Sequence, residues 1–221
     1  MFFSYRTNKR AAEEVIGSCG KNNCAAIQVD LEDAKSAKKL IDAAVRRFGR
    51  IDILVANHGV WPPEDVTVND MADAQWNRTV GVNLDSVFGL VKHAVSQMKK
   101  QRSGGHIVLV SSTAGQRGEA YHCDYAATKG AVISIVKGLS TELAQDGIYV
   151  NCVAPGWVDT EMAAPALNDP RLRRRAVEKI PLGRVASPEE IAAPILFLCT
   201  QHAAFITGEI LNVNGGAVLV G

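Results

Sequence analysis

The chain has 221 residues, of which 47% are hydrophobic and 21% are charged, and its formal net charge is +1. This composition is that of an ordinary globular protein, and the length suits one large α/β domain. The balanced charge argues against a nucleic-acid surface, and no apolar run approaches the ~20 residues that a membrane helix needs. We therefore expect neither a nucleic-acid nor a membrane partner.

The cysteines and histidines point away from disulfides and metals. There are five cysteines, an odd number with no Cys-x-x-Cys pair, which favours a reducing, cytoplasmic compartment. The five histidines are scattered without ligand spacing, so no metal site is expected. The N-terminus lacks the basic region, apolar stretch and cleavage site of a secretion signal.

Strand-like and helix-like segments alternate from the first residues. Apolar residues predict a short strand over 2–5, and helical spacing follows from Lys9. A second strand is predicted over 24–30, and the helix after it ends at Gly49. The apolar run 51–57 is of the kind found in strands buried on both faces.

The remainder of the chain continues this alternation. Helical spacing predicts helices, and apolar runs predict strands, in the order 70–100, 106–112, 125–146, 148–155, 187–200 and 208–216. Such alternation predicts one domain over residues 1–221, with a doubly wound parallel sheet between two layers of helices. In open sheets of this kind, ligands bind beyond the carboxyl ends of the strands.

Three residues near those strand ends form a candidate acid–base group. Tyr125 and Lys129 are four residues apart on a predicted helix and so share one face, and Ser112 ends the preceding strand. A free phenol has a pKa of about 10, which a nearby ammonium lowers. With a serine hydroxyl to orient a carbonyl oxygen, this group suits the interconversion of carbonyls and alcohols. The spacing alone equally fits the start of an amphipathic helix.

The surroundings of these residues resemble the short-chain dehydrogenase/reductase family over nearly the whole chain. The resemblance rests on "SSTAGQRGEAYHCDYAATKGA", "GVNLDSVFG", "DILVANHG", "APGWVDTEM" and "NVNGG". It implies a Rossmann-like fold and hydride transfer between a nicotinamide cofactor and a ketone or secondary alcohol. The catalytic residues that it implies are Asn83, Ser112, Tyr125 and Lys129.

Each of these residues receives a role from the resemblance. Tyr125 exchanges a proton with the substrate, and Ser112 holds the carbonyl oxygen. Lys129 lowers the pKa of the phenol and binds ribose hydroxyls. Asn83 lies at a helix distortion and completes a water relay that reaches the lysine. Without the resemblance, Asn83 is equally well interpreted as a polar helix residue with local hydrogen bonds.

The resemblance also implies a set of cofactor-binding residues. They are Arg6, Asp30, Leu31, Asn57, Gly59, Tyr125, Lys129, Pro155, Gly156, Val158 and Thr160. Family members that use NAD usually carry an acidic residue where this chain has "SYRTN", so Arg6 indicates NADP in preference to NAD. The alternative is a surface arginine. His58 replaces the usual alanine, either as a tolerated variant or with an effect near the adenine ribose.

The first residues align with the second strand of the family. The family's first strand ends in a glycine-rich turn, T-G-x-x-x-G-x-G, for which no counterpart is found, so a first βα unit of about 30 residues is expected to be missing. In the strand order 3-2-1-4-5-6-7, its absence separates strands two and three from strand four and exposes edges. Either the given start lies inside a longer coding region, or this is a shortened product with a rearranged sheet.

Within the family, "GIYVNCVAPGWVDTEM" resembles the 3-oxoacyl-(acyl-carrier-protein) reductases of fatty acid biosynthesis. This implies reduction of a 3-oxoacyl thioester and, as a partner, an acyl carrier protein. Sugar-alcohol, steroid and other secondary-alcohol dehydrogenases share these stretches and stay as alternatives. The expected lid covers about 157–187, where Trp157, Met162 and Leu167 either line an acyl pocket or pack the lid.

Two basic clusters are candidates for contact with an acidic carrier, or are simply solvated helix faces. They consist of Arg171, Arg173, Arg174 and Arg175, and of Lys99, Lys100 and Arg102. The family also implies a homodimer or homotetramer built on the helices of Asn83 and Tyr125 and on the terminal strand, with small residues at Ala131, Ser134 and Gly138. The alternative to an active enzyme is a truncated, catalytically silent paralogue that acts only as an oligomer partner.

Overall fold

The computed structural model describes residues 1–33 and 35–220. All the predicted strands are present within a few residues of their expected bounds. They are β1 (Phe2–Tyr5), β2 (Ala25–Gln28), β3 (Ile53–Ala56), β4 (Gly105–Val110), β5 (Ile148–Pro155) and β6 (Ile210–Val213). Every pairing is parallel, as the βα alternation predicts.

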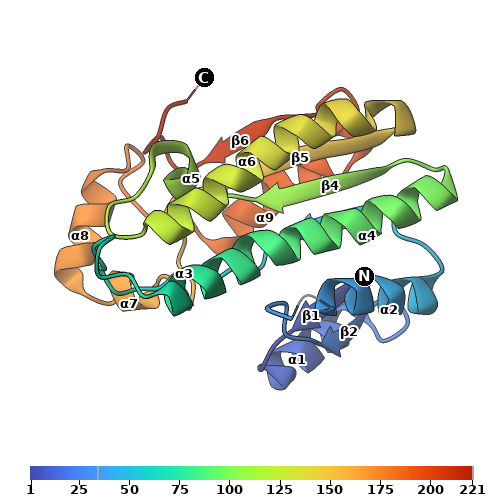
Figure 1. The fold of residues 1–221 in the computed structure, drawn as a ribbon, viewed down its shortest axis with the longest axis horizontal. Helices are drawn as coiled ribbons and strands as arrows, with labels where there is room; N and C mark the ends of the chain where they lie inside the picture. Colours follow the sequence, from blue (N-terminus) through green and yellow to red (C-terminus); the bar gives the residue numbers. More distant parts are fainter. Residues whose placement is uncertain (34, 221) are drawn as a thin grey trace.

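The strands of the described residues fall into two sheets, β1-β2 and β3-β4-β5-β6 (Figure 1). The break lies where the family resemblance places it, because β1 and β3 each keep one edge without a partner strand among the described residues. On β3, Ile53 is 48% exposed and Val55 is 40% exposed. The expectation that this strand is buried on both faces is therefore wrong, since no described element covers that face.

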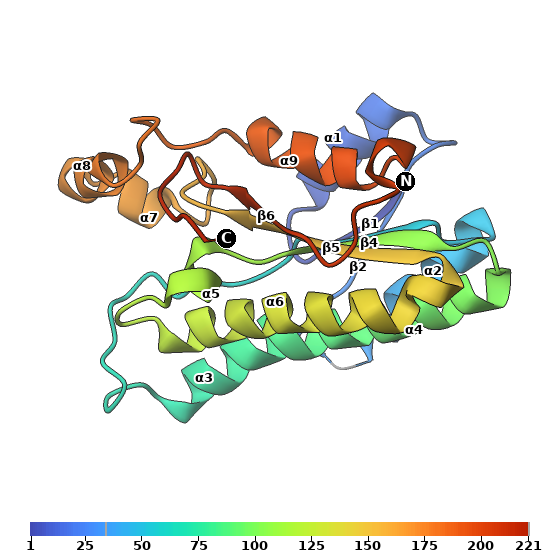
Figure 2. The same ribbon diagram turned by 90° about the horizontal axis from the view of Figure 1, so that it is seen from above.

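Helices lie on both sides of the sheets (Figure 2). On one side are α2 (Ser36–Phe48), α4 (Ser86–Gln101) and α6 (Cys123–Leu143), and on the other are α1 (Lys9–Cys19) and α9 (Pro188–Leu198). Capping residues fix several helix ends. The Asn8 side chain accepts a hydrogen bond from the Ala11 amide at the start of α1, and Gly49 ends α2 with a φ of 80°.

The predicted helix over 70–100 is interrupted. It consists of α3 (Asp73–Val80), a π-helical turn (Gly81–Asp85) and α4, in agreement with the distortion that the resemblance implies at Asn83. The short helix α5 (Thr113–Arg117) was not predicted. Such π turns are often found at functional sites, because they redirect a side chain without ending the helix.

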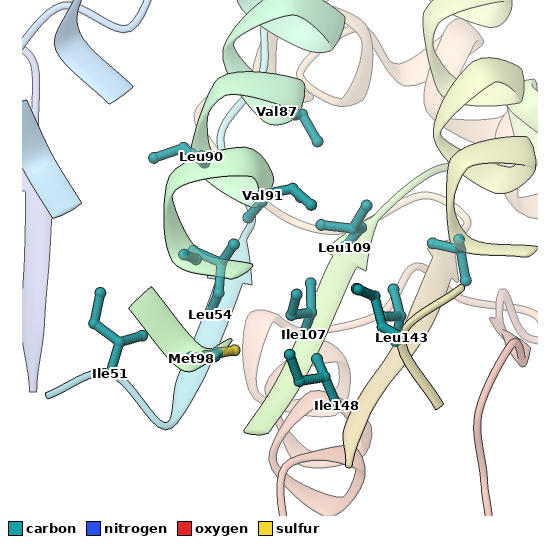
Figure 3. Packing of buried hydrophobic residues seen from close by; sticks show 14 of the residues in the cluster. Ile51, Leu54, Val87, Leu90, Val91, Met98, Ile107, Leu109, Leu143 and Ile148 are labelled. Atoms are coloured by element: carbon teal, nitrogen blue, oxygen red, sulfur yellow. The ribbon is translucent and has the colours of Figure 1, made fainter. Parts of the chain in front are cut away.

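The main core lies between the helices α4 and α6 and the strands β3, β4 and β5 (Figure 3). Ile107 and Leu109 of β4 are fully buried, and Leu90 and Val91 of α4 pack in the same cluster. Burying side chains of this size contributes about 1.5–3 kcal/mol each. This packing holds the carboxyl ends of the strands in place.

The lid helices lie beyond those carboxyl ends (Figure 1). They are α7 (Ala164–Leu167) and α8 (Pro170–Glu178), held by a small apolar cluster that includes Leu167, Ile180 and Val185. In the described part of the chain, no helix has the length and apolar character required to cross a bilayer.

Candidate active site

A cavity of about 370 Å³ opens at the carboxyl ends of β3, β4 and β5. It brings together three of the four candidate catalytic residues, Ser112, Tyr125 and Lys129. Its lining also contains six of the residues proposed to bind a cofactor, namely Asn57, Gly59, Pro155, Gly156, Val158 and Thr160. Residues more than 100 positions apart in the sequence therefore meet in one cleft.

The strand β4 and the helix α6 place Ser112, Tyr125 and Lys129. Ser112 follows β4 and caps α5, where its hydroxyl accepts a hydrogen bond of 3.1 Å from the Ala114 amide. One turn of α6 separates Tyr125 from Lys129, whose Nζ lies 5.7 Å from the centre of the phenol ring. The Lys129 side chain is buried, and its Nζ donates a hydrogen bond of 2.9 Å to the Val110 carbonyl.

Burial dominates the electrostatics of this group. It raises the pKa of Tyr125 to about 12, a shift that the hydroxyl of Ser112 partly opposes. It lowers the pKa of Lys129 to about 8, because the ammonium loses its hydration. Desolvation outweighs the lowering influence of Ser112 on the phenol, so the lowering of the Tyr125 pKa by Lys129 stays a prediction.

Asn83 is fully buried in the π-helical turn and anchors the loop after β3. Its Oδ1 accepts a hydrogen bond of 2.8 Å from the Val60 amide, and its Nδ2 donates one of 2.9 Å to the Val60 carbonyl. Within the described residues, no hydrogen bond joins Asn83 directly to Lys129. The structure thus gives Asn83 a loop-positioning role, and its part in a relay stays a prediction.

Close backbone contacts fix the turn of α6 that carries Lys129. The Ser111 hydroxyl donates a hydrogen bond of 2.7 Å to the Lys129 carbonyl. A Cβ added at Gly115 would lie 2.5 Å from the Lys129 carbonyl carbon, so only glycine lets α5 approach α6 this closely. At Gly59 an added Cβ would lie 3.2 Å from Asn83 Oδ1 and 3.5 Å from Lys129 Nζ.

Three proposed cofactor residues do not line the cavity. Arg6 and Asp30 are exposed beyond the ends of β1 and β2, and Leu31 packs against the main core. The strands β1 and β2, which these residues follow, form a separate sheet. This separation accounts for the absence of these residues from the cavity around Lys129. The predicted cofactor set is therefore split between the cavity and the β1-β2 unit.

Sequence reasoning missed part of the cavity wall, including Trp61 and Arg117. The rings of Trp61 and Trp157 meet edge to face with their centroids 6.1 Å apart, and Trp61 also packs against His122. Trp61 is a large aromatic residue five positions after the end of β3, and this position was the sequence signal that could have placed it at the site. Of the three residues considered for an acyl pocket, Trp157 and Met162 line the cavity, whereas Leu167 is buried in the lid.

A family model described as enoyl-(acyl carrier protein) reductase matches residues 1–218. The 3-oxoacyl-(acyl-carrier-protein) reductase FabG of Escherichia coli (strain K12) is 36% identical over 211 residues, which are 96% of this chain and 83% of that protein. Its counterpart in Thermotoga maritima is 37% identical over 86% of this chain and 76% of its own length.

A crystal structure from Brucella melitensis, titled as a short-chain dehydrogenase/reductase and glucose/ribitol dehydrogenase, has a TM-score of 0.90 and 34% identity. The match covers 99% of this chain and 86% of that one. The chain belongs to the short-chain dehydrogenase/reductase family. It is an NAD(P)-dependent oxidoreductase with a Rossmann-like α/β fold. These relatives are named for different substrates.

The cavity of this short-chain dehydrogenase/reductase fits the nicotinamide side of a dinucleotide. Gly59 and Gly156 allow close packing at the cavity wall, since an added Cβ would lie 3.2 Å from Asn83 Oδ1 at Gly59 and 3.1 Å from Asn214 at Gly156. Lys129 would supply a cation for sugar hydroxyls of such a cofactor, and Asn57 and Val158 lie on the same lining. When bound, the nicotinamide supplies or accepts the hydride.

Proposed function

We propose that this chain reduces the ketone of a 3-oxoacyl thioester to a secondary alcohol, with NADP preferred over NAD. The observation that carries this proposal is the convergence of Ser112, Tyr125 and Lys129 on one cavity with tryptophan walls. The relatives whose names specify 3-oxoacyl-(acyl-carrier-protein) reduction support the choice of substrate. The preference for NADP rests on Arg6 at the end of β1.

The residues of the cavity have distinct tasks in this reaction. The Ser112 hydroxyl donates a hydrogen bond to the substrate carbonyl oxygen and holds it beside Tyr125. As the carbonyl carbon receives a hydride, the Tyr125 phenol transfers its proton to that oxygen and becomes a phenolate. The charge of Lys129 stabilises this phenolate, which regains a proton from solvent. A raised phenol pKa keeps Tyr125 protonated and ready to donate at neutral pH.

One substitution tests the chemistry. Tyr125→Phe keeps the ring and removes the proton donor, so we expect turnover of acetoacetyl-N-acetylcysteamine to fall at least about 10³-fold. The affinity for NADPH should change less than about twofold, measured by quenching of tryptophan fluorescence, because Trp61 and Trp157 line the cavity. Retained turnover in this variant would overturn the proposal.

A second candidate function is that of a silent partner in an oligomer. Its support is the separation of β1-β2 from the larger sheet, which leaves Arg6 and Asp30 away from the cavity. This candidate would be favoured if the wild-type chain is folded, as judged by circular dichroism, but neither binds NADPH nor turns over the thioester. Micromolar NADPH binding together with turnover would reject it.

The carrier-protein partner is proposed to contact α8. Arg171, Arg173 and Arg175 are exposed there and make no ion pair within residues 1–33 and 35–220. The other basic cluster lies at the end of α4, next to the amino end of β4 and thus opposite the cavity, and its Lys99 pairs with Asp146 at 2.7 Å. These differences favour α8 as the docking surface for an acidic carrier.

Charge reversal tests this partner. We expect the triple variant Arg171→Glu, Arg173→Glu and Arg175→Glu to raise KM at least about tenfold for acetoacetyl-acyl carrier protein. KM for acetoacetyl-N-acetylcysteamine should stay within about twofold, since that substrate has no carrier to dock. The double variant Lys99→Glu and Lys100→Glu is the matched control. Equal effects of both variants on KM for the carrier substrate would reject α8 as the specific surface.

A further inference from the structure

His58 occupies the cavity wall between Asn57 and Gly59, directly after β3. Its Nε2 lies 2.5 Å from the hydroxyl oxygen of Ser86, the first residue of α4. Ser86 is itself buried, so this edge of the imidazole is enclosed by protein. Neither residue has a part in the proton transfer described above.

The hydrogen bonds of Ser86 decide which nitrogen of His58 carries the proton. A serine hydroxyl has one proton to donate, and Ser86 donates it to the Val82 carbonyl over 2.6 Å. Ser86 can then only accept from the imidazole, so His58 Nε2 must be the N–H donor. The Nδ1 atom consequently carries a free lone pair and acts as a hydrogen-bond acceptor.

The imidazole is held in this neutral form. Burial, assisted by the positive charge of Lys129 and opposed by a hydrogen bond with the Val82 backbone, lowers the pKa of His58 to about 4. At neutral pH the ring is therefore an uncharged acceptor, on the same cavity lining as the cationic donor Lys129. In the described part of the chain, no protein group donates to His58 Nδ1, whereas Lys129 Nζ already has one partner, the Val110 carbonyl.

A sugar hydroxyl needs both kinds of group. When its oxygen accepts a hydrogen bond from an ammonium, its own proton requires an acceptor. We propose that His58 is a cofactor-positioning residue, whose Nδ1 accepts a hydrogen bond from a ribose hydroxyl of the bound nicotinamide dinucleotide, with Ser86 fixing the tautomer. This inference rests on the proposed function, because it uses the same dinucleotide site.

The first test is NADPH affinity, measured by tryptophan fluorescence and by calorimetry. One neutral hydrogen bond contributes about 0.5–1.5 kcal/mol, so His58→Ala should weaken NADPH binding about 2- to 12-fold. Ser86→Ala removes the group that fixes the tautomer of His58. It should weaken NADPH binding by a smaller factor, about 2 to 4. The exposed His202 provides a matched control, and His202→Ala should bind NADPH as the wild type does.

The second test observes the imidazole in the wild-type protein and needs no folded variant. Nitrogen-15 spectra of labelled histidine should show His58 with a protonated Nε2 and a bare Nδ1 at pH 7. Saturation with NADPH should shift the Nδ1 resonance, which a purely structural histidine would not do. In Ser86→Ala, a mixture of both tautomers is expected.

The outcomes separate this inference from the proposed function. If the wild type binds NADPH but His58→Ala binds it within twofold, or the Nδ1 resonance does not move, the inference is wrong and the proposed function stands. If the wild type binds no NADPH, both fail. A protonated Nδ1 in the free protein would likewise overturn the tautomer assignment.

Discussion

Tyr125 combines a high pKa with access to the cavity. Its protonation state therefore affects the reduction and oxidation directions of the reaction differently. Reduction needs the protonated phenol, which predominates far below a pKa of about 12. Oxidation of the alcohol needs the phenolate, whose fraction grows about tenfold for each pH unit below that value. The same residue therefore makes the two directions of the reaction respond differently to pH.

We predict that kcat/KM for alcohol oxidation rises with a logarithmic slope near +1 between pH 6 and 8. Over the same range, kcat/KM for thioester reduction should change less than about threefold. Initial rates in constant-ionic-strength buffers measure both, and circular dichroism at each pH serves as the control for folding. An oxidation rate that is flat with pH would contradict a phenol pKa well above neutrality.

Lys129, a proposed catalytic residue, is buried at an energetic cost. Its pKa of about 8 in the folded chain lies below its ordinary value of 10.5, so the unfolded chain binds more protons between these two pH values. The free energy of unfolding therefore increases as pH rises from about 8 to 10.5, because of the titration of Lys129. The shift corresponds to about 3 kcal/mol as an upper bound.

Lys129→Met should consequently stabilise the protein at pH 7, by about 1–3 kcal/mol in urea unfolding. The gain is smaller than the bound because the Val110 carbonyl loses its partner. The difference from the wild type should shrink at pH 9.5, where Lys129 is already neutral when folded. A variant that is less stable than the wild type at both pH values would show that burial of the ammonium carries no such cost.

At the scale of elements, the π-helical turn is the feature that couples α4 to the cavity. It directs Asn83 at the backbone of Val60, so that both polar groups of one loop residue are satisfied by a single amide. This anchor fixes the loop that carries Gly59 and Trp61 into the cavity wall. The turn thus acts on the site through the loop after β3.

Asn83→Ala removes both hydrogen bonds and leaves the Val60 amide and carbonyl without these partners. We expect a loss of about 1–3 kcal/mol in the free energy of unfolding, measured with urea. The matched control is Asn77→Ala on the exposed face of α3, which should change stability by less than about 0.5 kcal/mol. Equal effects of the two substitutions would contradict an anchoring role.

The elements were largely predictable, and particular interactions were not. Apolar runs, helical spacing and the helix end at Gly49 predicted the strands and most helices, because these signals act locally. The exposure of Ile53 was not predictable from its apolar run, since covering a strand depends on elements elsewhere. The grouping of Ser112, Tyr125 and Lys129 followed from the motif, but their desolvation is a property of the folded environment.

The hydrogen bond between His58 and Ser86 illustrates a second limit. The two residues are 28 positions apart, and nothing local to either predicts that they meet. Their contact arises only because the loop after β3 lies against the start of α4. Sequence reasoning identified His58 as unusual, and only the packing reveals which of its nitrogens is free.

At the scale of the molecule, the outer faces of α4 and α6 favour association with further copies of the chain. Phe88 on α4 is 59% exposed, and an added Cβ at Gly138 on α6 would meet nothing within 4 Å. Isolated exposed apolar residues are common, but an exposed aromatic ring on α4 and an open glycine on α6 suit close helix contact. We therefore predict a homodimer or homotetramer that uses these helices.

Phe88→Glu should shift that oligomer to a smaller species, as measured by size-exclusion chromatography with light scattering. The added carboxylate would have to be buried without a partner in a helix interface. Val68→Glu, at a loop position that is 77% exposed, is the matched control and should leave the molar mass unchanged. An unchanged mass for Phe88→Glu, or a monomeric wild type, would contradict this interface.

The two sheets are expected to differ in local stability. The β4 strand has a paired strand on each side, and Ile107, Val108 and Leu109 are fully buried. By contrast, β1 and β2 form a two-stranded unit with only partly buried strand residues, an arrangement that is marginal by itself. Packing of α2 on α4 attaches this unit to the rest of the chain, with Ala37 close to Gly89.

We predict that amides of β1 and β2 exchange with deuterium at least about 100-fold faster than those of β4 and β5, because the small unit opens without global unfolding. Hydrogen exchange with mass spectrometry measures this, with peptides from α1 reporting on the same unit. Gly89→Ala, which crowds Ala37, should speed exchange in β1 and β2 while leaving β5 unchanged. Equal protection of both sheets would instead mean that the joint between α2 and α4 couples them into a single cooperative unit.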